Sequence, residues 1–201
     1  MGDAPGRRRR ARRLTSPVFE RGPDGLVYEP EFLTPEEERA LLARFDTLEF
    51  EEIRMRGQVA RRTALHYGVH YDYDNPGESS RGEPIPGWLG PLRDRCADLA
   101  GVTPDELVEA LVQRYPPGAT IGWHRDAPQF GKVAGVSLGS SCRLRLRRVK
   151  ADRRREVVEL ELEPRSAYVF SGSARWQWQH SIPSTKALRY SITFRTLRRE
   201  S

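Results

Sequence analysis

The second half of the chain is a succession of short segments in which apolar and polar residues alternate. Alternation with a period of two residues is typical of β-strands that bury one face. Turn residues separate the segments, so we expect many short strands rather than a few long ones. Eight strands are predicted, at residues 111–115, 120–123, 133–138, 141–149, 157–162, 166–170, 176–182 and 188–196. Eight short strands at this spacing favour a double-stranded β-helix, or jelly-roll, barrel.

Helical patterns precede the strands and make the expected fold class α+β. After a short strand near residues 26–28, Thr34 and Glu37 form the pattern of a capping box around Pro35, which predicts a helix that ends near Asp46. A second helix is predicted over 86–100, where apolar residues recur every three or four positions. We expect both helices to support the barrel.

Residues 50–85 are rich in arginine, histidine, tyrosine and turn-forming residues. One interpretation is a substrate lid, because aromatic and arginine side chains on a loop can stack on a flat base and hold a phosphate. The alternative is a pair of strands that pack their tyrosines on the core. The residues alone leave the two interpretations balanced.

The domain organisation follows from charge and composition. Arginines crowd residues 7–13 within a stretch that has few apolar residues, so residues 1–17 are predicted to be a disordered basic tail. That tail is either an electrostatic arm for phosphates or a solvated terminus. Residues 18–201 are predicted to form a single domain with its barrel core at about 110–198 and its lid at about 50–85.

The net charge of +6 comes almost entirely from arginine. A basic balance favours polyanionic partners such as nucleic acid, although a GC-rich genome would produce a similar composition. The chain has no apolar run long enough for a membrane span, and we expect no signal peptide. Cys96 and Cys142 lack the spacing of a metal site, so we expect reduced core thiols and a cytoplasmic protein. We expect a monomer.

A candidate metal site begins at His124 and Asp126, which lie two residues apart and therefore point the same way on an extended segment. His180 lies on the seventh predicted strand, and a double-stranded barrel brings its second and seventh strands side by side. Two histidines and one carboxylate form the facial triad that leaves positions open on Fe(II) for oxygen chemistry.

A candidate co-substrate site follows from the last strand. Oxygen activation on such an iron needs electrons, and an oxo-acid that chelates the metal is the usual donor. Arg189 and Arg195 are six residues apart and so share one face, where arginine suits bidentate carboxylate binding. Tyr115, on the first barrel strand, could add a hydroxyl donor.

These residues resemble the AlkB-like 2-oxoglutarate and Fe(II)-dependent dioxygenases over roughly residues 26–198. The motifs that carry the resemblance are Tyr115-Pro116-Pro117-Gly118, Ile121-Gly122-Trp123-His124-Arg125-Asp126, Ser171-Gly172 with Arg175, Trp178 and His180-Ser181-Ile182, and the segment Arg189 to Arg195. The resemblance implies that His124, Asp126 and His180 bind iron. It also implies that Arg189 grips the C5 carboxylate of 2-oxoglutarate with help from Tyr115, and that Arg195 lies near the C1 carboxylate.

The chain departs from the family pattern at three places. Gln113 stands where Asn is frequent, and it could still hydrogen-bond the co-substrate. Ser191 stands where Asn often follows the first clamp arginine. Residues 127–130 lack the second acidic residue of many repair-type members, which puts the base preference in doubt.

The resemblance implies oxidative dealkylation of alkylated nucleobases in DNA or RNA, with Fe(II) as cofactor, 2-oxoglutarate as co-substrate and O2 as oxidant. Single-stranded or damaged nucleic acid is the expected partner, because extracting a base from an intact duplex costs a few kcal/mol. The alternatives are the same chemistry on a protein or small molecule, and a nucleic-acid binder without activity. The candidates to stack on the base are Tyr67, His70, Tyr71 and Trp88.

Overall fold

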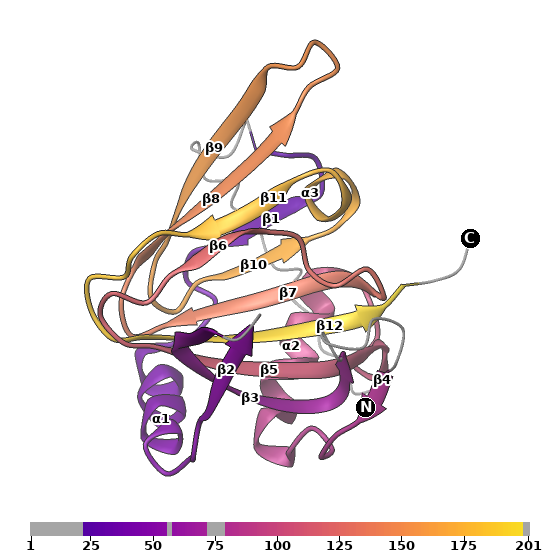
Figure 1. Ribbon diagram of the computed structural model, residues 1–201. Coiled ribbons are helices and arrows are strands. Elements are labelled where there is room, and N and C mark those ends of the chain that lie inside the picture. Colours follow the sequence, from indigo (N-terminus) through magenta and orange to yellow (C-terminus); the bar gives the residue numbers. More distant parts are fainter. Residues whose placement is uncertain (1–21, 56–57, 72–78, 199–201) are drawn as a thin grey trace, which may run out of the picture.

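The computed structural model describes residues 22–55, 58–71 and 79–198, which form two antiparallel sheets and a few helices (Figure 1). The large sheet has the strand order β1-β10-β7-β12-β5-β3-β2, with β4 paired to β3, and the small sheet has the order β6-β11-β8-β9. The large sheet comprises β1 (Leu26–Glu29), β2 (Glu51–Met55), β3 (Gln58–Tyr71), β4 (Ser79–Arg81), β5 (Leu107–Tyr115), β7 (Phe130–Leu138), β10 (Ala167–Phe170) and β12 (Arg189–Leu197). The small sheet comprises β6 (Ile121–His124), β8 (Cys142–Val149), β9 (Arg155–Leu162) and β11 (Gln179–Ile182).

Strands β5 to β12 are the eight strands of the predicted barrel, and the double-stranded β-helix is confirmed. The second and seventh of them, β6 and β11, pair as expected. One predicted strand, 176–182, was wrong in its first half. A single helical turn, α3 (Gly172–Trp176), ends at the first residue of that range, residues 177–178 connect it to the sheet, and β11 begins only at Gln179. The turn buries Ala174 and Arg175, so tertiary packing decides its conformation.

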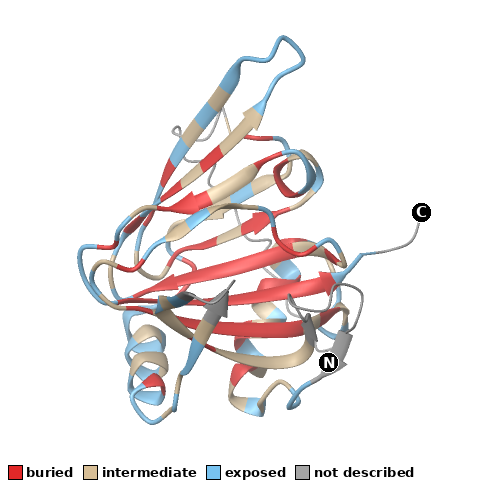
Figure 2. Cartoon of the chain, in the orientation of Figure 1, coloured by how far each residue is buried: buried red, intermediate tan, exposed pale blue. Residues whose placement is uncertain are grey.

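Two helices cover one face of the large sheet. Helix α1 (Pro35–Phe45) begins with the predicted capping box of Thr34 and Glu37, and Phe45 is buried. Helix α2 (Gly90–Ala100), preceded by the 3-10 turn η2 (Gly87–Leu89), ends at Gly101 in the left-handed conformation (φ 62°). A second 3-10 turn, η3 (Pro104–Glu106), leads into β5. Figure 2 shows the most buried residues along the central strands of this sheet.

The large sheet therefore has two different faces. On the helix side, residues such as Val112, Ile192 and Phe194 belong to one apolar core together with residues of α1 and α2. On the other side, a second core between the two sheets includes Leu146, Phe170 and Trp178. Both cysteines are buried thiols, as the sequence predicts. Among the described residues, no helix is long and apolar enough to cross a membrane.

Part of the predicted lid is regular sheet. Strand β2 pairs with β3, and β3 pairs with the barrel strand β5 along residues 63–68. For residues 51–55 and 58–71 the structure thus shows the strand-pair arrangement, and a lid role for 50–85 stays a prediction. Residues 72–78 and the predicted basic tail, 1–17, lie outside the described residues.

Candidate metal and co-substrate site

Strand pairing brings the three predicted metal ligands together. His180 on β11 is the direct partner of His124 on β6, and their ring centroids are 4.2 Å apart. Asp126 follows β6, and its Oδ2 lies 3.7 Å from His180 Nε2. Two donor atoms that each lie about 2.1 Å from one cation are at most about 4.2 Å apart, so a single ion can bridge this pair.

Arg195 holds the carboxylate of Asp126 in place. Its Nε and Nη2 donate to Asp126 Oδ1 at 3.0 and 2.7 Å, while its Nη1 donates to Glu109 Oε2 at 2.6 Å. All three side chains are at least nine-tenths buried. Burial alone would raise the pKa of Asp126, but Arg195 and then the two histidines outweigh it, and the net pKa is lowered. The carboxylate is therefore ionised, with Oδ1 bound to Arg195 and Oδ2 facing His180.

The two imidazoles are oriented as metal ligands. His124 Nδ1 lies 2.9 Å from the carbonyl oxygen of Gly122, which orients the ring and leaves Nε2 for another partner. The ring of Phe170 packs against His180 at 5.1 Å. Burial lowers the pKa of His180 to about 3, so its ring is uncharged at neutral pH. Two neutral imidazoles and one ionised carboxylate are the ligands that a facial Fe(II) site requires, and the residues present fit that metal.

A second polar cluster lies on the face of the large sheet that also carries Arg195. Arg189 on β12 is the direct partner of Tyr115 on β5, and the guanidinium lies 4.9 Å from the tyrosine ring centroid. Arg189 Nε donates to Ser137 Oγ at 3.2 Å, and the Tyr115 hydroxyl donates to Gln113 Oε1 at 2.8 Å. Ser191 pairs in register with both Gln113 and Ser137. The predicted residues Tyr115, Arg189, Gln113 and Ser191 are thus brought together.

One atom of this cluster indicates a ligand. Arg189 is 1% exposed, and its Nη1 has no hydrogen-bond partner among the described residues. An unpaired buried donor on a charged group is costly, because the group has lost its hydration without gaining a partner. A carboxylate would remove that cost, so the cluster fits one end of a dicarboxylic oxo-acid.

Sequence reasoning missed three further residues of the site, Glu109, Ser137 and Phe170, and it named Arg175 only as part of a family motif, without a role. Glu109 anchors Arg195, Ser137 anchors Arg189, and Phe170 packs on His180. Arg175 donates to the carbonyl oxygens of Ala127, Phe130 and Gly131 at 2.7, 2.7 and 2.9 Å, which ties down the loop after Asp126. The sequence does contain a signal for Glu109 and Ser137, since each is a polar residue that interrupts a run of apolar residues.

Two of the four predicted base-stacking residues lie away from this site. Tyr67 and Trp88 pack against the core on the helix side, and Trp88 lies 6.3 Å from the ring of Phe45. Tyr67 is the register partner of Ala110, which belongs to that core, so strand alternation turns it away from the triad. Both assignments are withdrawn. The side chains of His70 and Tyr71 lie outside the described residues.

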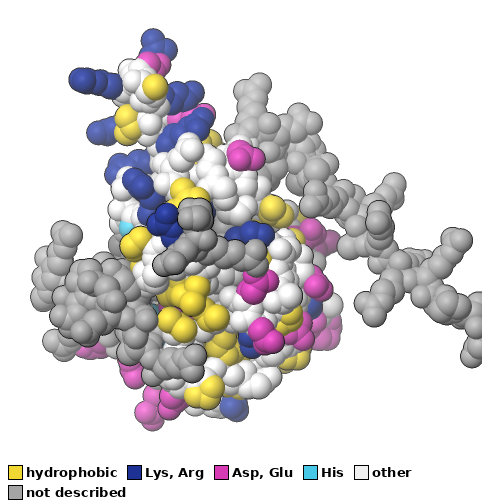
Figure 3. Space-filling model, turned by 90° about the vertical axis from the view of Figure 1, so that its right-hand side faces the viewer, with side chains coloured by type: hydrophobic (Ala, Val, Ile, Leu, Met, Phe, Trp, Pro, Cys, Tyr) yellow, Lys and Arg dark blue, Asp and Glu magenta, His cyan; other side chains and the backbone are white. Residues whose placement is uncertain are grey.

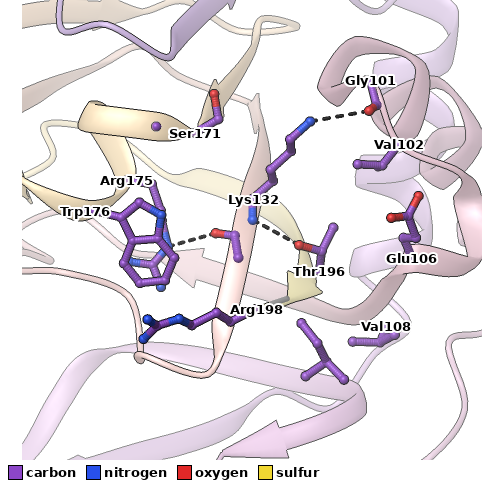
Figure 4. Close-up of a pocket in the computed structure, with 13 residues that line it drawn as sticks. Gly101, Val102, Glu106, Val108, Lys132, Ser171, Arg175, Trp176, Thr196 and Arg198 are labelled. Atoms are coloured by element: carbon purple, nitrogen blue, oxygen red, sulfur yellow. Dashed lines mark hydrogen bonds between the residues drawn. The ribbon is translucent and has the colours of Figure 1, made fainter. Parts of the chain in front are cut away.

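A separate pocket of about 700 Å³ lies outside the barrel, between the end of α2, α3 and the end of β12. Figure 4 shows Lys132 reaching across it to the Gly101 carbonyl, with Trp176 and Arg198 on the opposite side. None of the three triad residues lines it.

Comparisons with known proteins identify the family of the chain. A sequence model of the 2OG-Fe(II) oxygenase superfamily matches residues 25–195. The chain is 28% identical over 175 residues to the Xenopus tropicalis protein named tRNA (carboxymethyluridine(34)-5-O)-methyltransferase alkbh8, covering 82% of this chain but 26% of that protein. It is 27% identical to the Arabidopsis thaliana protein named alkylated DNA repair protein ALKBH8 homolog, covering 81% of this chain and 51% of that protein. The chain thus spans between a quarter and a half of these relatives.

Solved structures show the same fold. The structure of OsALKBH1 superposes with a TM-score of 0.64 at 14% identity, covering 86% of this chain and 98% of that one. A Pseudomonas putida prolyl-4-hydroxylase superposes with a TM-score of 0.56 at 21% identity, covering 88% and 94%. As the sequence predicts, the chain belongs to the 2OG-Fe(II) oxygenase superfamily, it is similar to AlkB-type members, and its matched region is a domain of the kind that uses Fe(II) and 2-oxoglutarate.

Proposed function

We propose that this dioxygenase removes N-alkyl groups, above all methyl groups, from nucleobases in DNA or RNA. The observation that carries the substrate class is the similarity, over more than 80% of the chain, to one relative named for tRNA and another named for alkylated DNA repair. The net charge of +6 supports it, because positive charge favours polyanionic substrates.

In this proposal His124, Asp126 and His180 hold Fe(II). Bound there with 2-oxoglutarate and O2, the metal supplies the oxidation: one oxygen atom enters succinate, carbon dioxide leaves, and the other oxygen hydroxylates the N-methyl carbon, which departs as formaldehyde. Arg195 orients the ligand oxygen of Asp126 through the two hydrogen bonds to Oδ1. A further contact of Arg195 with the C1 carboxylate of the co-substrate stays a prediction.

Arg189 binds the C5 carboxylate of 2-oxoglutarate through its unpaired Nη1. Ser137 fixes the guanidinium from one side by accepting from Nε. Tyr115 and Gln113 form a hydrogen-bonded pair that can turn toward the same carboxylate, and Ser191 lies between them and Ser137 in register. The proposal is supported by the charged, buried donor of Arg189, which is already held in position, so little reorganisation is needed when a carboxylate binds.

The test is a substrate panel with two readouts. The full chain, supplied with Fe(II), 2-oxoglutarate and O2, is assayed for succinate and for formaldehyde on N-methylated single-stranded oligonucleotides and on methylated peptides. We expect formaldehyde from the oligonucleotides and none from His124→Ala or Asp126→Ala. If formaldehyde is released from the peptides alone, the substrate is a protein and the proposal is rejected.

A further inference from the structure

A pocket lined mainly by arginine and glutamine lies on the small sheet, next to the triad. It has a volume of about 280 Å³. Apart from Val149, its lining residues are all basic or amide side chains: Arg125, Arg147, Arg148, Arg155, Gln177 and Gln179. We call these six residues the basic pocket. No carboxylate is among the residues that line it, which all belong to the described part of the chain.

Much of the positive charge in the basic pocket is not neutralised. Arg147 Nε donates to the neutral Gln179 Oε1 at 2.9 Å, and Arg125 Nη1 donates to the Trp176 carbonyl at 3.3 Å. Arg148 is different, since its Nε lies 2.8 Å from Glu156 Oε2. Within the described residues, Arg125, Arg147 and Arg155 form no ion pair with a carboxylate, so three unit charges face one small space.

Arg147 is also held in position. Its guanidinium lies 4.3 Å from the centroid of the Trp123 ring, and Gln179 fixes its Nε. A guanidinium stacked on an aromatic ring keeps its outer N–H groups available, because stacking uses the face of the group rather than its edge. The outer nitrogens of Arg147 can therefore form a bidentate contact with an anion.

The basic pocket is adjacent in sequence to every ligand position of the triad. Arg125 lies between His124 and Asp126, and Gln179 precedes His180. Gln179 is the register partner of Arg147, while His180 is the partner of buried Leu146, so alternation places the first pair on the outer face and the second on the inner face. A nucleotide whose base enters between the sheets leaves its sugar and phosphates outside, where the basic pocket lies.

The positive surface continues beyond the pocket. The hairpin between β8 and β9 carries Lys150, Arg153 and Arg154, and all three are exposed. Figure 3 shows Lys and Arg side chains gathered over this hairpin at the top of the molecule and below it. A single strand of nucleic acid carries one negative charge for every nucleotide. An extended row of arginines therefore matches such a strand better than it matches an isolated anion.

We propose that the basic pocket binds the phosphodiester backbone of a single-stranded nucleic acid whose target base occupies the metal site. The inference rests on the proposed function, which it refines by assigning the surface that holds the strand. Arg147 and Arg155 contact phosphates directly, and the β8–β9 hairpin extends the same track.

The experiment measures binding separately from turnover. Affinity of the full chain for a fluorescein-labelled single-stranded oligonucleotide is determined by fluorescence anisotropy over a series of salt concentrations. The variants are Arg147→Gln with Arg155→Gln, the same pair changed to Lys, and the control Arg39→Gln. Arg39 is an exposed arginine of α1, paired with Glu36, and helix α1 lies far from the β8–β9 hairpin in Figure 1. The arginine-rich N-terminus is present in the wild type and in every variant, so differences in affinity between them report the basic pocket alone.

We expect the double Gln variant to bind about tenfold more weakly and to lose about 1.4 from the slope of log K against log salt, since each phosphate contact on a single strand contributes about 0.7. The Lys pair retains most of the affinity because a point charge still neutralises a phosphate, and Arg39→Gln binds like the wild type. The single variant Arg155→Gln should show about half of the slope change. Because Arg155 is exposed, this variant keeps the test valid even if the double variant is unstable.

Two results overturn the inference. Unchanged affinity and slope in the double variant, while formaldehyde is still released from the methylated oligonucleotide, would place the phosphates elsewhere and leave the proposed function intact. Equal binding of poly-glutamate would show a general anion surface for acidic proteins. By contrast, succinate formation without any oligonucleotide binding or turnover would reject the proposed function itself.

Discussion

The Arg195 guanidinium bridges Asp126 and Glu109, with nitrogen–oxygen distances of 2.7 and 2.6 Å. The bridge joins a proposed metal ligand to a buried acid on the neighbouring strand β5, where Arg195 and Glu109 are register partners. His66 Nδ1 lies 3.8 Å from the other oxygen of Glu109. Glu109 therefore contributes the negative charge that balances Arg195 and leaves the charge of Asp126 for a cation.

Glu109→Gln should weaken Fe(II) binding. The substitution removes one negative charge beside Arg195, so the site becomes more positive and Arg195 is less firmly oriented. We expect the Fe(II) concentration for half-maximal succinate formation to rise about 10- to 100-fold, as for other residues that support metal ligands. The matched control is Glu161→Gln, an exposed change of the same charge on β9. A similar Fe(II) requirement in the two variants would contradict this role.

Arg189→Met should raise the apparent KM for 2-oxoglutarate about 100-fold, because a hydrogen-bonded ionic contact with a carboxylate is lost. Arg189→Lys should have an intermediate effect, since lysine supplies the charge without the bidentate geometry. Tyr115→Phe should raise the KM only a few-fold. Succinate formation at varied 2-oxoglutarate is the measurement, and Arg93→Met on α2 is the control. An unchanged KM in Arg189→Met would remove this residue from the co-substrate site.

The triad could be predicted from sequence because its geometry depends on local rules. Alternation along a strand places His124 and Asp126 together, and the barrel topology pairs β6 with β11, so His180 follows. Arg189 and Tyr115 were found for the same reason, since the long β5 and β12 strands face each other in register.

The failures share one physical cause, which is that long-range partners, including those set by strand register, are not visible before folding. The direction of the Tyr67 side chain depends on its pairing with Ala110, and the partner of Glu109 depends on its pairing with Arg195. Residues 172–176 form a helical turn because Arg175 packs inward onto backbone carbonyls of another segment. Nothing within the local sequence of that segment reveals such a long-range contact.

Arg175→Ala should destabilise the protein by about 3 kcal/mol or more. Arg175 is 3% exposed and donates to three carbonyl oxygens of the loop after Asp126, and hydrogen bonds to charged groups contribute about 1.5–3 kcal/mol each. The matched control is Arg198→Ala. Arg198 is exposed and, like Arg175, lies over the Trp176 ring, at 5.1 Å from its centroid compared with 4.3 Å for Arg175. The control should change the free energy of unfolding by no more than about 0.5 kcal/mol. Urea-induced unfolding measures both, and equal losses would show that the carbonyl contacts contribute little.

Gly135→Ala should be destabilising only while Tyr168 is present. A Cβ at Gly135 would overlap the Tyr168 ring, which lies across β7 on the face that carries the co-substrate cluster. Overpacking of this kind costs about 1–3 kcal/mol. In a Tyr168→Ala background the space is vacant, so we expect a coupling free energy of at least about 1 kcal/mol in the double-mutant cycle. Gly122→Ala is the matched control, since a Cβ there meets nothing within 4 Å. If Gly135→Ala costs the same in both backgrounds, the tyrosine ring does not occupy this space.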